Sequence, residues 1–179
     1  MTHTGTVYGQ ALYSLAREES LTEALLTQLR LVQGCLDAEP DYLRLLGSVS
    51  LSKPERCQLL DESLGAALHP YLLNFMKILV EHGKISCFPQ CFDAYQQEYY
   101  HDHNILPVTA VTAIALSQPQ IQRLKEKLAG ITGKNVLLSN QVDPALLGGV
   151  RLEYDGKQLE DSISQRMQQM RQLLKNTVL

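Results

Sequence analysis

The stretch that most constrains the fold is residues 135–156, with the sequence NVLLSNQVDPALLGGVRLEYDG. Residues 136–142 alternate in character with the two-residue period of a β-strand. Asp143-Pro144 ends this strand, because proline fixes φ and has no amide hydrogen to give to a ladder. Gly148-Gly149 marks a backbone conformation or contact that a Cβ would forbid, and residues 150–154 alternate again. The stretch therefore predicts two strands of one sheet.

Asp155-Gly156 follows the second strand and is typical of a tight hairpin turn. Between the strands, Leu146-Leu147 is expected to insert into an apolar region. These residues predict sheet structure and carry no catalytic chemistry.

The composition excludes several classes of protein. The chain has 179 residues, of which 45% are hydrophobic and 20% charged, enough apolar surface for a packed core. The longest weakly polar run, residues 106–116, falls short of the ~20 apolar residues that a membrane span needs. The first residues lack the basic patch and apolar core of an export signal, and they hold no arginine before Arg17. We therefore expect an intracellular protein without a membrane span.

The two parts of the chain differ in charge. Residues 1–104 hold 7 Lys/Arg and 13 Asp/Glu, whereas residues 105–179 hold 9 and 6. Ten of the eleven aromatic residues also lie in the first part, leaving Tyr154 in the second. This contrast predicts two domains, 1–104 and 105–179.

The first domain is expected to be an all-α bundle of six helices with short loops. Apolar residues recur at helical spacing along each segment, as in the stripe of Leu25, Leu29 and Val32. The pattern S-x-x-E occurs from Ser20 and from Ser52, and both are interpreted as capping boxes. Gly83 is expected to cap the helix over 71–82.

The second domain is expected to be a small α/β unit with a mixed sheet, so that the whole chain belongs to the α+β class. A strand over 108–116, a helix from Ser117 to Gly130 and the strand over 136–142 predict a right-handed crossover and a parallel pair. A hairpin over 149–160 extends the sheet. Asp161 or Ser162 is expected to start a last helix, whose narrow apolar seam is Ile163, Met167, Met170 and Leu174.

Known catalytic and cofactor motifs are missing from the sequence. Gly130-Ile-Thr-Gly133-Lys134 is too short for a phosphate-binding loop and follows a helix instead of a strand. Ser, His and Asp occur in no nucleophile-elbow context, and no cofactor is expected. The net charge of +3 after residue 104 lacks the interleaved aromatics of a nucleic-acid interface, so no nucleic acid is expected.

Four cysteines, Cys35, Cys57, Cys87 and Cys91, lie at helix-like positions and are interpreted as reduced thiols acting as small hydrophobes. Cys87 and Cys91, together with His101 or His103, offer enough donors for zinc. The aromatic residues around them favour core packing. A metal-regulated adaptor that uses Cys87, Cys91 and a histidine is the alternative function.

Protein–protein contact is the remaining prediction. Residues 71–82 are apolar almost all round, which indicates a helix buried on two sides or one that holds a partner. Together with the helix over 6–17, it would suit an amphipathic helix laid between them. Periodicity alone leaves both interpretations open.

Three motifs in order resemble the delta subunit of F-type ATP synthases, whose mitochondrial counterpart is the oligomycin-sensitivity-conferring protein. YGQAL from Tyr8 is similar to the family's Y-A-x-A-L-F opening, and NFMKILVEHGK from Asn74 to its N-x-[IL]-x-x-L-x-E-x-x-R helix. The third match covers the family's D-x-x-[LI]-x-G-G, turn and D-x-S-x-x-x-[RK]-[LM] segments, here Asp143, Gly148-Gly149, Asp155-Gly156 and Asp161 to Met167. Gly9 replaces the usual Ala, Lys84 stands for Arg, and Gln165 occupies a position that is often Gly.

The resemblance implies a non-catalytic stator subunit of a proton-translocating F-type ATP synthase, peripheral to the cytoplasmic face of the plasma membrane and associated with it only through the complex. Its helical domain would hold the N-terminal helix of an alpha subunit in a groove between the first and fifth helices. Its second domain would bind the b-subunit stalk, so that rotor torque drives ATP synthesis. Carried onto this sequence, the groove residues are Tyr8, Ala11, Leu15, Asn74, Phe75 and Ile78, and the stalk contacts are Ile163, Met167, Met170 and Leu174.

Overall fold

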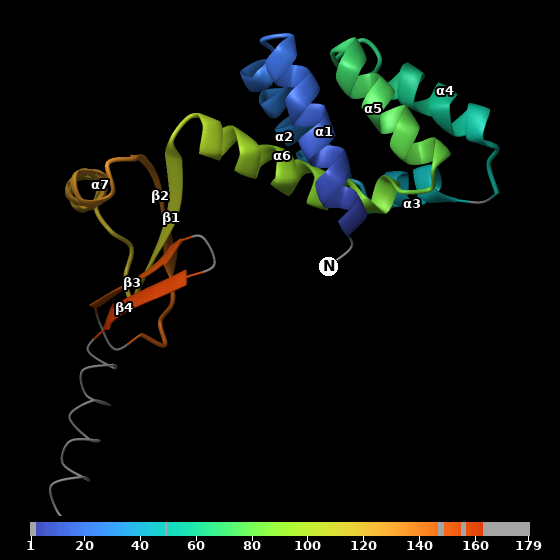
Figure 1. Ribbon diagram of the computed structural model, residues 1–179. Coiled ribbons are helices and arrows are strands. Elements are labelled where there is room, and N and C mark those ends of the chain that lie inside the picture. The colour runs from blue at the N-terminus through green and yellow to red at the C-terminus, as the bar shows by residue number, and fades with distance from the viewer. Residues whose placement is uncertain (1–2, 49, 147–148, 155–156, 163–179) are drawn as a thin grey trace, which may run out of the picture. The chain divides into compact units, whose positions relative to one another are not determined.

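The computed structural model describes residues 3–48, 50–146, 149–154 and 157–162. Contacts divide the chain into two compact units, Met1–Tyr99 and Tyr100–Leu179. Helices make up the first unit, and a sheet with one helix makes up the described part of the second (Figure 1). This agrees with the predicted α+β class. The domain boundary after residue 104 stays a prediction.

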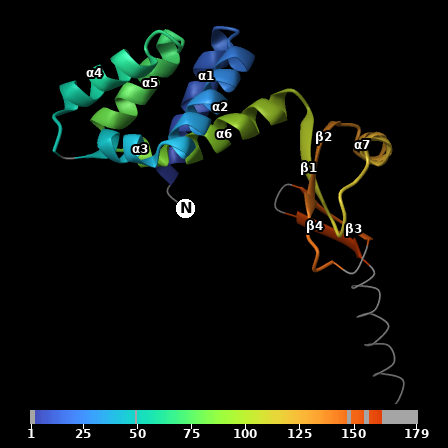
Figure 2. The same ribbon diagram turned by 180° about the vertical axis from the view of Figure 1, so that it is seen from behind.

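The described part of the first unit forms helices joined by short loops, as predicted, and Figure 2 shows them from behind. In chain order they are α1 (His3–Glu18), α2 (Thr22–Ala38), α3 (Pro40–Gly47), α4 (Lys53–Leu64), α5 (Pro70–Glu81), the 3-10 helix η1 (Ile85–Cys87) and α6 (Phe88–Asp102).

One hydrophobic core joins these helices. Leu25 and Leu29 of α2, Leu72 of α5 and Phe88 and Tyr95 of α6 are fully buried in it. Burial of each such side chain contributes about 1.5–3 kcal/mol, so the interlocked stripes hold the unit together. The Tyr95 hydroxyl leaves the apolar region by donating to the Thr22 carbonyl oxygen at 2.9 Å, which satisfies its polar end.

The predicted caps are confirmed at α4 and α5. The Glu55 carboxylate accepts from the Ser52 amide at 2.8 Å, completing the capping box. After α5, Gly83 has a φ of 64°, and the Lys84 amide donates to the Leu79 carbonyl oxygen at 2.7 Å. This bond pattern is a Schellman motif, in which the left-handed glycine lets the chain leave the helix.

The capping box predicted from Ser20 is wrong. Ser20 has a φ of 58°. The N-cap residue of α2 is Leu21, whose side chain makes no capping hydrogen bond. The Leu21 amide donates to the Ala16 carbonyl oxygen at 2.8 Å, so Ser20 closes α1 in the left-handed conformation. An N-cap needs extended backbone, so Ser20 cannot also start α2.

The second unit contains, within its described residues, β1 (Ile105–Thr112), α7 (Gln118–Thr132), β2 (Asn135–Val142), β3 (Gly149–Tyr154) and β4 (Lys157–Ser162). The sheet order is β2-β1-β3-β4, with β1 parallel to β2 and the other neighbours antiparallel. The mixed sheet and the strand–helix–strand crossover are therefore confirmed.

Three boundaries differ from the prediction. The first strand covers Ile105–Thr112 instead of 108–116, because Pro107 lies outside the part of β1 that pairs with β3 and its missing amide hydrogen is tolerated there. The helix α7 continues past Gly130 to Thr132 and is capped by Gly133, whose φ is 67°. The strand β4 extends to Ser162, so no helix begins at Asp161 or Ser162.

The signature stretch around Asp143 connects the sheet as a structural turn. The Asp143 amide donates to the Thr112 carbonyl oxygen at 2.9 Å, and its carboxylate accepts from the Ala145 amide at 3.0 Å. Leu146 is buried and Gly149 has a φ of 94°, in line with the predictions for these two residues. Leu147, Gly148 and the Asp155-Gly156 turn lie outside the described residues.

Candidate functional site

The six predicted groove residues lie on two neighbouring helices, α1 and α5. We call Tyr8, Ala11, Leu15, Asn74, Phe75 and Ile78 the α1/α5 surface. The Tyr8 ring contacts the Phe75 ring edge-on, with centroids 6.5 Å apart and an interplanar angle of 71°. The Tyr8 hydroxyl lies 3.5 Å from His82 Nδ1 at the C-terminal end of α5. These two contacts bring the predicted residues of α1 and α5 together.

The members of this surface differ in exposure. Leu15 is 36% exposed and Ile78 41%, and Ala11 and Asn74 are also exposed. Phe75 is only 7% exposed, so it belongs mainly to the core, with half-buried Tyr8 over its edge. A partner can therefore touch a small apolar surface whose base is the Tyr8–Phe75 pair. The predicted groove residues did not include His82 or the exposed Val7, although each is four residues from a member of this surface, Ile78 and Ala11 respectively.

The opposite side of α1 is closed by α6. A Cβ at Gly9 would lie 2.3 Å from the Cys91 carbonyl oxygen and 2.8 Å from Ala94 Cβ, closer than real Cβ atoms come. Gly9 therefore lies where the backbone of α1 comes close to the Cys91 carbonyl oxygen and the Ala94 side chain of α6. This contact fixes which face of α1 remains available beside α5.

The residues proposed for a metal do not form a site. Among the residues that the structure describes, no three His, Cys, Asp or Glu side chains are placed to hold a metal ion. Cys91 is buried, and burial raises the pKa of its thiol to about 12. Cys91 is thus a core side chain, as the aromatic neighbours suggested. Cys35, in contrast, is exposed and does not pack as a small hydrophobe, so the interpretation of the four thiols is wrong at this position.

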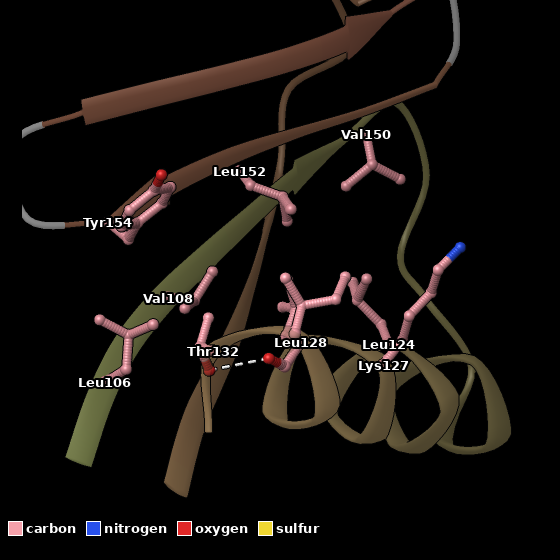
Figure 3. Close-up of a pocket in the computed structure, with 10 residues that line it drawn as sticks. Leu106, Val108, Leu124, Lys127, Leu128, Thr132, Val150, Leu152 and Tyr154 are labelled. Carbon is pink, nitrogen blue, oxygen red and sulfur yellow. Dashed lines mark hydrogen bonds between the residues drawn. The ribbon is translucent and has the colours of Figure 1, made fainter. Parts of the chain in front are cut away.

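The second unit has an apolar groove that the sequence did not predict. Figure 3 shows side chains of α7 and of the sheet facing each other across it. Its volume is about 410 Å³, and it is lined by Leu106, Val108, Leu124, Lys127, Leu128, Ile131, Thr132, Val150, Leu152 and Tyr154. The sequence placed several of these residues on inward faces, but periodicity does not tell whether a second element covers them. We call this the α7/sheet groove.

The predicted stalk contacts Ile163, Met167, Met170 and Leu174 lie outside the described residues. Within the described ranges, no helix is long and apolar enough to cross a membrane.

The model of the ATP synthase delta (OSCP) subunit family matches residues 5–174. The chain belongs to this family. Delta (OSCP) subunits are non-catalytic structural components of the peripheral stalk of F-type ATP synthases.

Individual delta subunits are similar over most of their length. The ATP synthase subunit delta of Moorella thermoacetica is 30% identical over 168 residues, covering 94% of this chain and 94% of its own. That of Clostridioides difficile is 28% identical over 172 residues, covering 96% and 95%.

Among solved structures, a chain of the Toxoplasma gondii mitochondrial ATP synthase hexamer matches with a TM-score of 0.76 at 17% identity. The match covers 97% of this chain and 98% of that one, which supports the fold. The similarity thus extends over both units.

Proposed function

We propose that the α1/α5 surface holds the N-terminal helix of an alpha subunit, and that the second unit contacts the b-subunit stalk. The observation that carries the first part is the contact of Tyr8 with Phe75 beneath exposed Leu15 and Ile78. Exposed apolar side chains on two adjacent helices, with a partly buried aromatic between them, suit an amphipathic helix.

The size of the surface fits a short helical ligand. Tyr8 and Leu15 are seven residues apart on α1, so the apolar row is ~10 Å long, about two helical turns. Each anchor side chain buried there would contribute ~1.5–3 kcal/mol. Four to six anchors from the two partners together would reach roughly the 12 kcal/mol of a nanomolar complex after the cost of association.

Holding both partners would give the chain its mechanical role. A link between the catalytic head and the stalk resists the torque of the rotor, so that rotation drives ATP synthesis and does not spin the head. In this role the chain would lie at the cytoplasmic face of the plasma membrane, attached through the complex.

The decisive experiment places a charge in the middle of the surface. In Ala11→Asp, a carboxylate would have to be desolvated against an apolar helix, so affinity for a synthetic peptide of the alpha N-terminus should fall at least a hundredfold. Ala11 is exposed on α1, so helical circular dichroism should remain unchanged.

Thr6→Asp is the matched control, because Thr6 is also exposed on α1 but lies about 140° from Ala11 around the helix axis, away from the α1/α5 surface. It should bind the peptide as the wild-type chain does. Unchanged affinity of Ala11→Asp, with intact circular dichroism, would remove the α1/α5 surface as the binding site.

A further inference from the structure

The helix α7 has no buried side chain, unlike α2, α5 and α6 of the first unit. Its apolar face carries Leu124 and Leu128, which are only half-buried, and Ile131, which is 74% exposed. An amphipathic helix is stabilised mainly by covering its apolar face. The face of α7 is therefore incompletely covered by the described residues.

The sheet shows the same deficit on the same side. Side chains of β1 and β3 that share one face line the α7/sheet groove together with α7 (Figure 3). Val108 of β1 is buried, whereas Leu152 of β3 is only half-buried. Four strands make a sheet ~19 Å wide, whereas a helix with its side chains is only ~10 Å across. One helix can therefore cover about half of this face.

The position of α7 tells which half remains open. α7 packs on β2, where Val136 is only 1% exposed. The groove lies beside it, over β1 and β3, where Val150, Leu152 and Tyr154 remain partly exposed. The open half is thus as wide as one further helix.

The lining also indicates the chemistry of the occupant. Of its polar groups, the Thr132 hydroxyl donates to the Leu128 carbonyl oxygen at 2.8 Å, and the Lys127 side chain extends from α7 at the edge of the groove in Figure 3. The remaining lining side chains are aliphatic apart from Tyr154. Apart from Lys127 at its edge, the lining offers no charge to a polar small molecule, and it favours apolar side chains.

We propose that residues 163–179 of the same chain fill the α7/sheet groove as a second helix, with Ile163, Met167, Met170 and Leu174 against its lining. These four residues recur at spacings of four, three and four, the period of one helical face. The positions opposite them on such a helix hold mostly amides, Gln165, Gln168, Gln169, Gln172 and Asn176, together with Lys175 and the last residue, Leu179. The segment therefore has one strongly apolar side.

The connection and the lengths agree with this occupant. Ser162, the last residue of β4, pairs with Gly149, so the chain leaves the sheet beside the Val150 end of the groove. From Ile163 to Leu174 a helix rises ~16 Å, and the groove face of β3 from Val150 to Tyr154 is ~13 Å long. A turn of a few residues after Ser162 lets the rest of the segment fold back along α7.

This inference goes beyond the proposed function and changes one part of it. A seam that covers its own sheet is not free to contact the b-subunit stalk. The stalk would then meet the amide-rich side of the segment or another face of the second unit. The tests below use the isolated chain, so they can fail without affecting the binding of the alpha peptide.

Disulfide trapping tests the position of the segment. In a Cys35→Ser background, which removes the exposed native thiol, the pair Ile131→Cys and Leu174→Cys joins residues expected at the same end of the groove. We expect this pair to form an intramolecular disulfide under mild oxidation at least tenfold faster than the control pair Ile131→Cys and Ile163→Cys, whose residues belong to opposite ends. Peptide mapping by mass spectrometry identifies the bond.

Equal rates for the two pairs, or a disulfide found only between two chains, would overturn the proposal. The second result would assign the groove to another copy.

A dye that fluoresces on exposed apolar surface, 1-anilinonaphthalene-8-sulfonate, tests whether the groove is covered. Met167→Gln with Met170→Gln should weaken the cover and raise the fluorescence severalfold, whereas Gln168→Ala with Gln172→Ala should leave it unchanged. If the wild-type chain already binds the dye as strongly as the methionine variant, the groove is open in the free chain and is reserved for a foreign helix, contrary to the proposal.

Discussion

Tyr8 of α1 lies edge-on against Phe75 of α5, and this contact joins the first and fifth helices at the proposed binding surface. Edge-to-face aromatic pairs add about 0.5–1.5 kcal/mol beyond the area they bury. Tyr8→Ala removes the pair and an anchor for the ligand. We expect the affinity for the alpha peptide to fall at least tenfold, measured by isothermal titration calorimetry.

Tyr8→Phe separates the ring from the hydroxyl. The hydroxyl lies 3.5 Å from His82 Nδ1, a long and weak hydrogen bond, so this variant should bind within about twofold of wild type. A loss in Tyr8→Phe as large as that in Tyr8→Ala would show that the hydroxyl, and not ring packing, determines binding.

Gly9 is expected to be the least replaceable glycine of the described helices. The added Cβ of Gly9→Ala would meet the Cys91 carbonyl oxygen at 2.3 Å, and backbone cannot move as a flexible side chain does. Overpacking of this kind costs typically ~1–3 kcal/mol, more than the gain in helix propensity. Urea unfolding should show that loss of stability.

Gly34→Ala is the control for Gly9→Ala. Gly34 is an exposed residue of α2, and its added Cβ would meet nothing within 4 Å. This variant should stabilise the chain by ~0.5–1 kcal/mol, because alanine loses less backbone entropy in a helix. If both variants changed stability in the same direction, close packing of α1 on α6 would not explain the glycine at position 9.

Local sequence signals predicted most of the elements. Proline at a helix start and glycine after its end located α5, because both residues act through their own backbone. The parallel pairing of β1 with β2 followed from the intervening helix, since a crossover of this kind has one preferred hand.

The failures arose where two signals competed for one residue. Ser20 fits a capping box, yet the end of α1 needs a left-handed residue at the same position, and tertiary packing decided between the two.

Helical spacing also did not predict exposure along α1. Tyr8, Leu12 and Leu15 share a helical face by spacing, but Leu12 is buried and Leu15 is exposed, because this face lies at the edge of the core.

The α7/sheet groove was missed for a different reason. The sequence showed that Leu124 and Leu128 form an apolar face, but hydrophobic periodicity reports the need for cover and not its source. The width of the sheet shows that α7 alone cannot cover its face. That width depends on the strand order β2-β1-β3-β4, which no local sequence pattern predicts.

Cys91 should be almost inert toward alkylation in the folded chain. Burial raises the pKa of its thiol to about 12, so at pH 8.5 roughly one molecule in 3,000 carries the reactive thiolate. Cys35 is exposed and should react with iodoacetamide at least a thousandfold faster, as followed by mass spectrometry of digested samples. In guanidinium chloride the two should react alike. Fast labelling of Cys91 in the folded chain would mean that α1 and α6 separate readily.

The capping box of α4 should make the free energy of unfolding depend on pH. The similar capping box of α7 should not. Hydrogen bonds from Ser52 lower the pKa of the exposed Glu55 carboxyl in the folded chain. A lowered folded pKa stabilises the fold above the unfolded value of about 4.3, and this contribution is lost as the pH falls through the folded pKa. The loss of stability in Ser52→Ala should therefore be greater at pH 7 than at pH 3.

Ser117 pairs in the same way with Gln120, whose amide does not titrate, so the effect of Ser117→Ala should not change between these two pH values. Thermal unfolding followed by circular dichroism measures both differences. An effect of Ser52→Ala that is equally large at pH 3 would show that the serine acts by accepting the Glu55 amide, 3.4 Å from its hydroxyl oxygen, and not through the carboxylate.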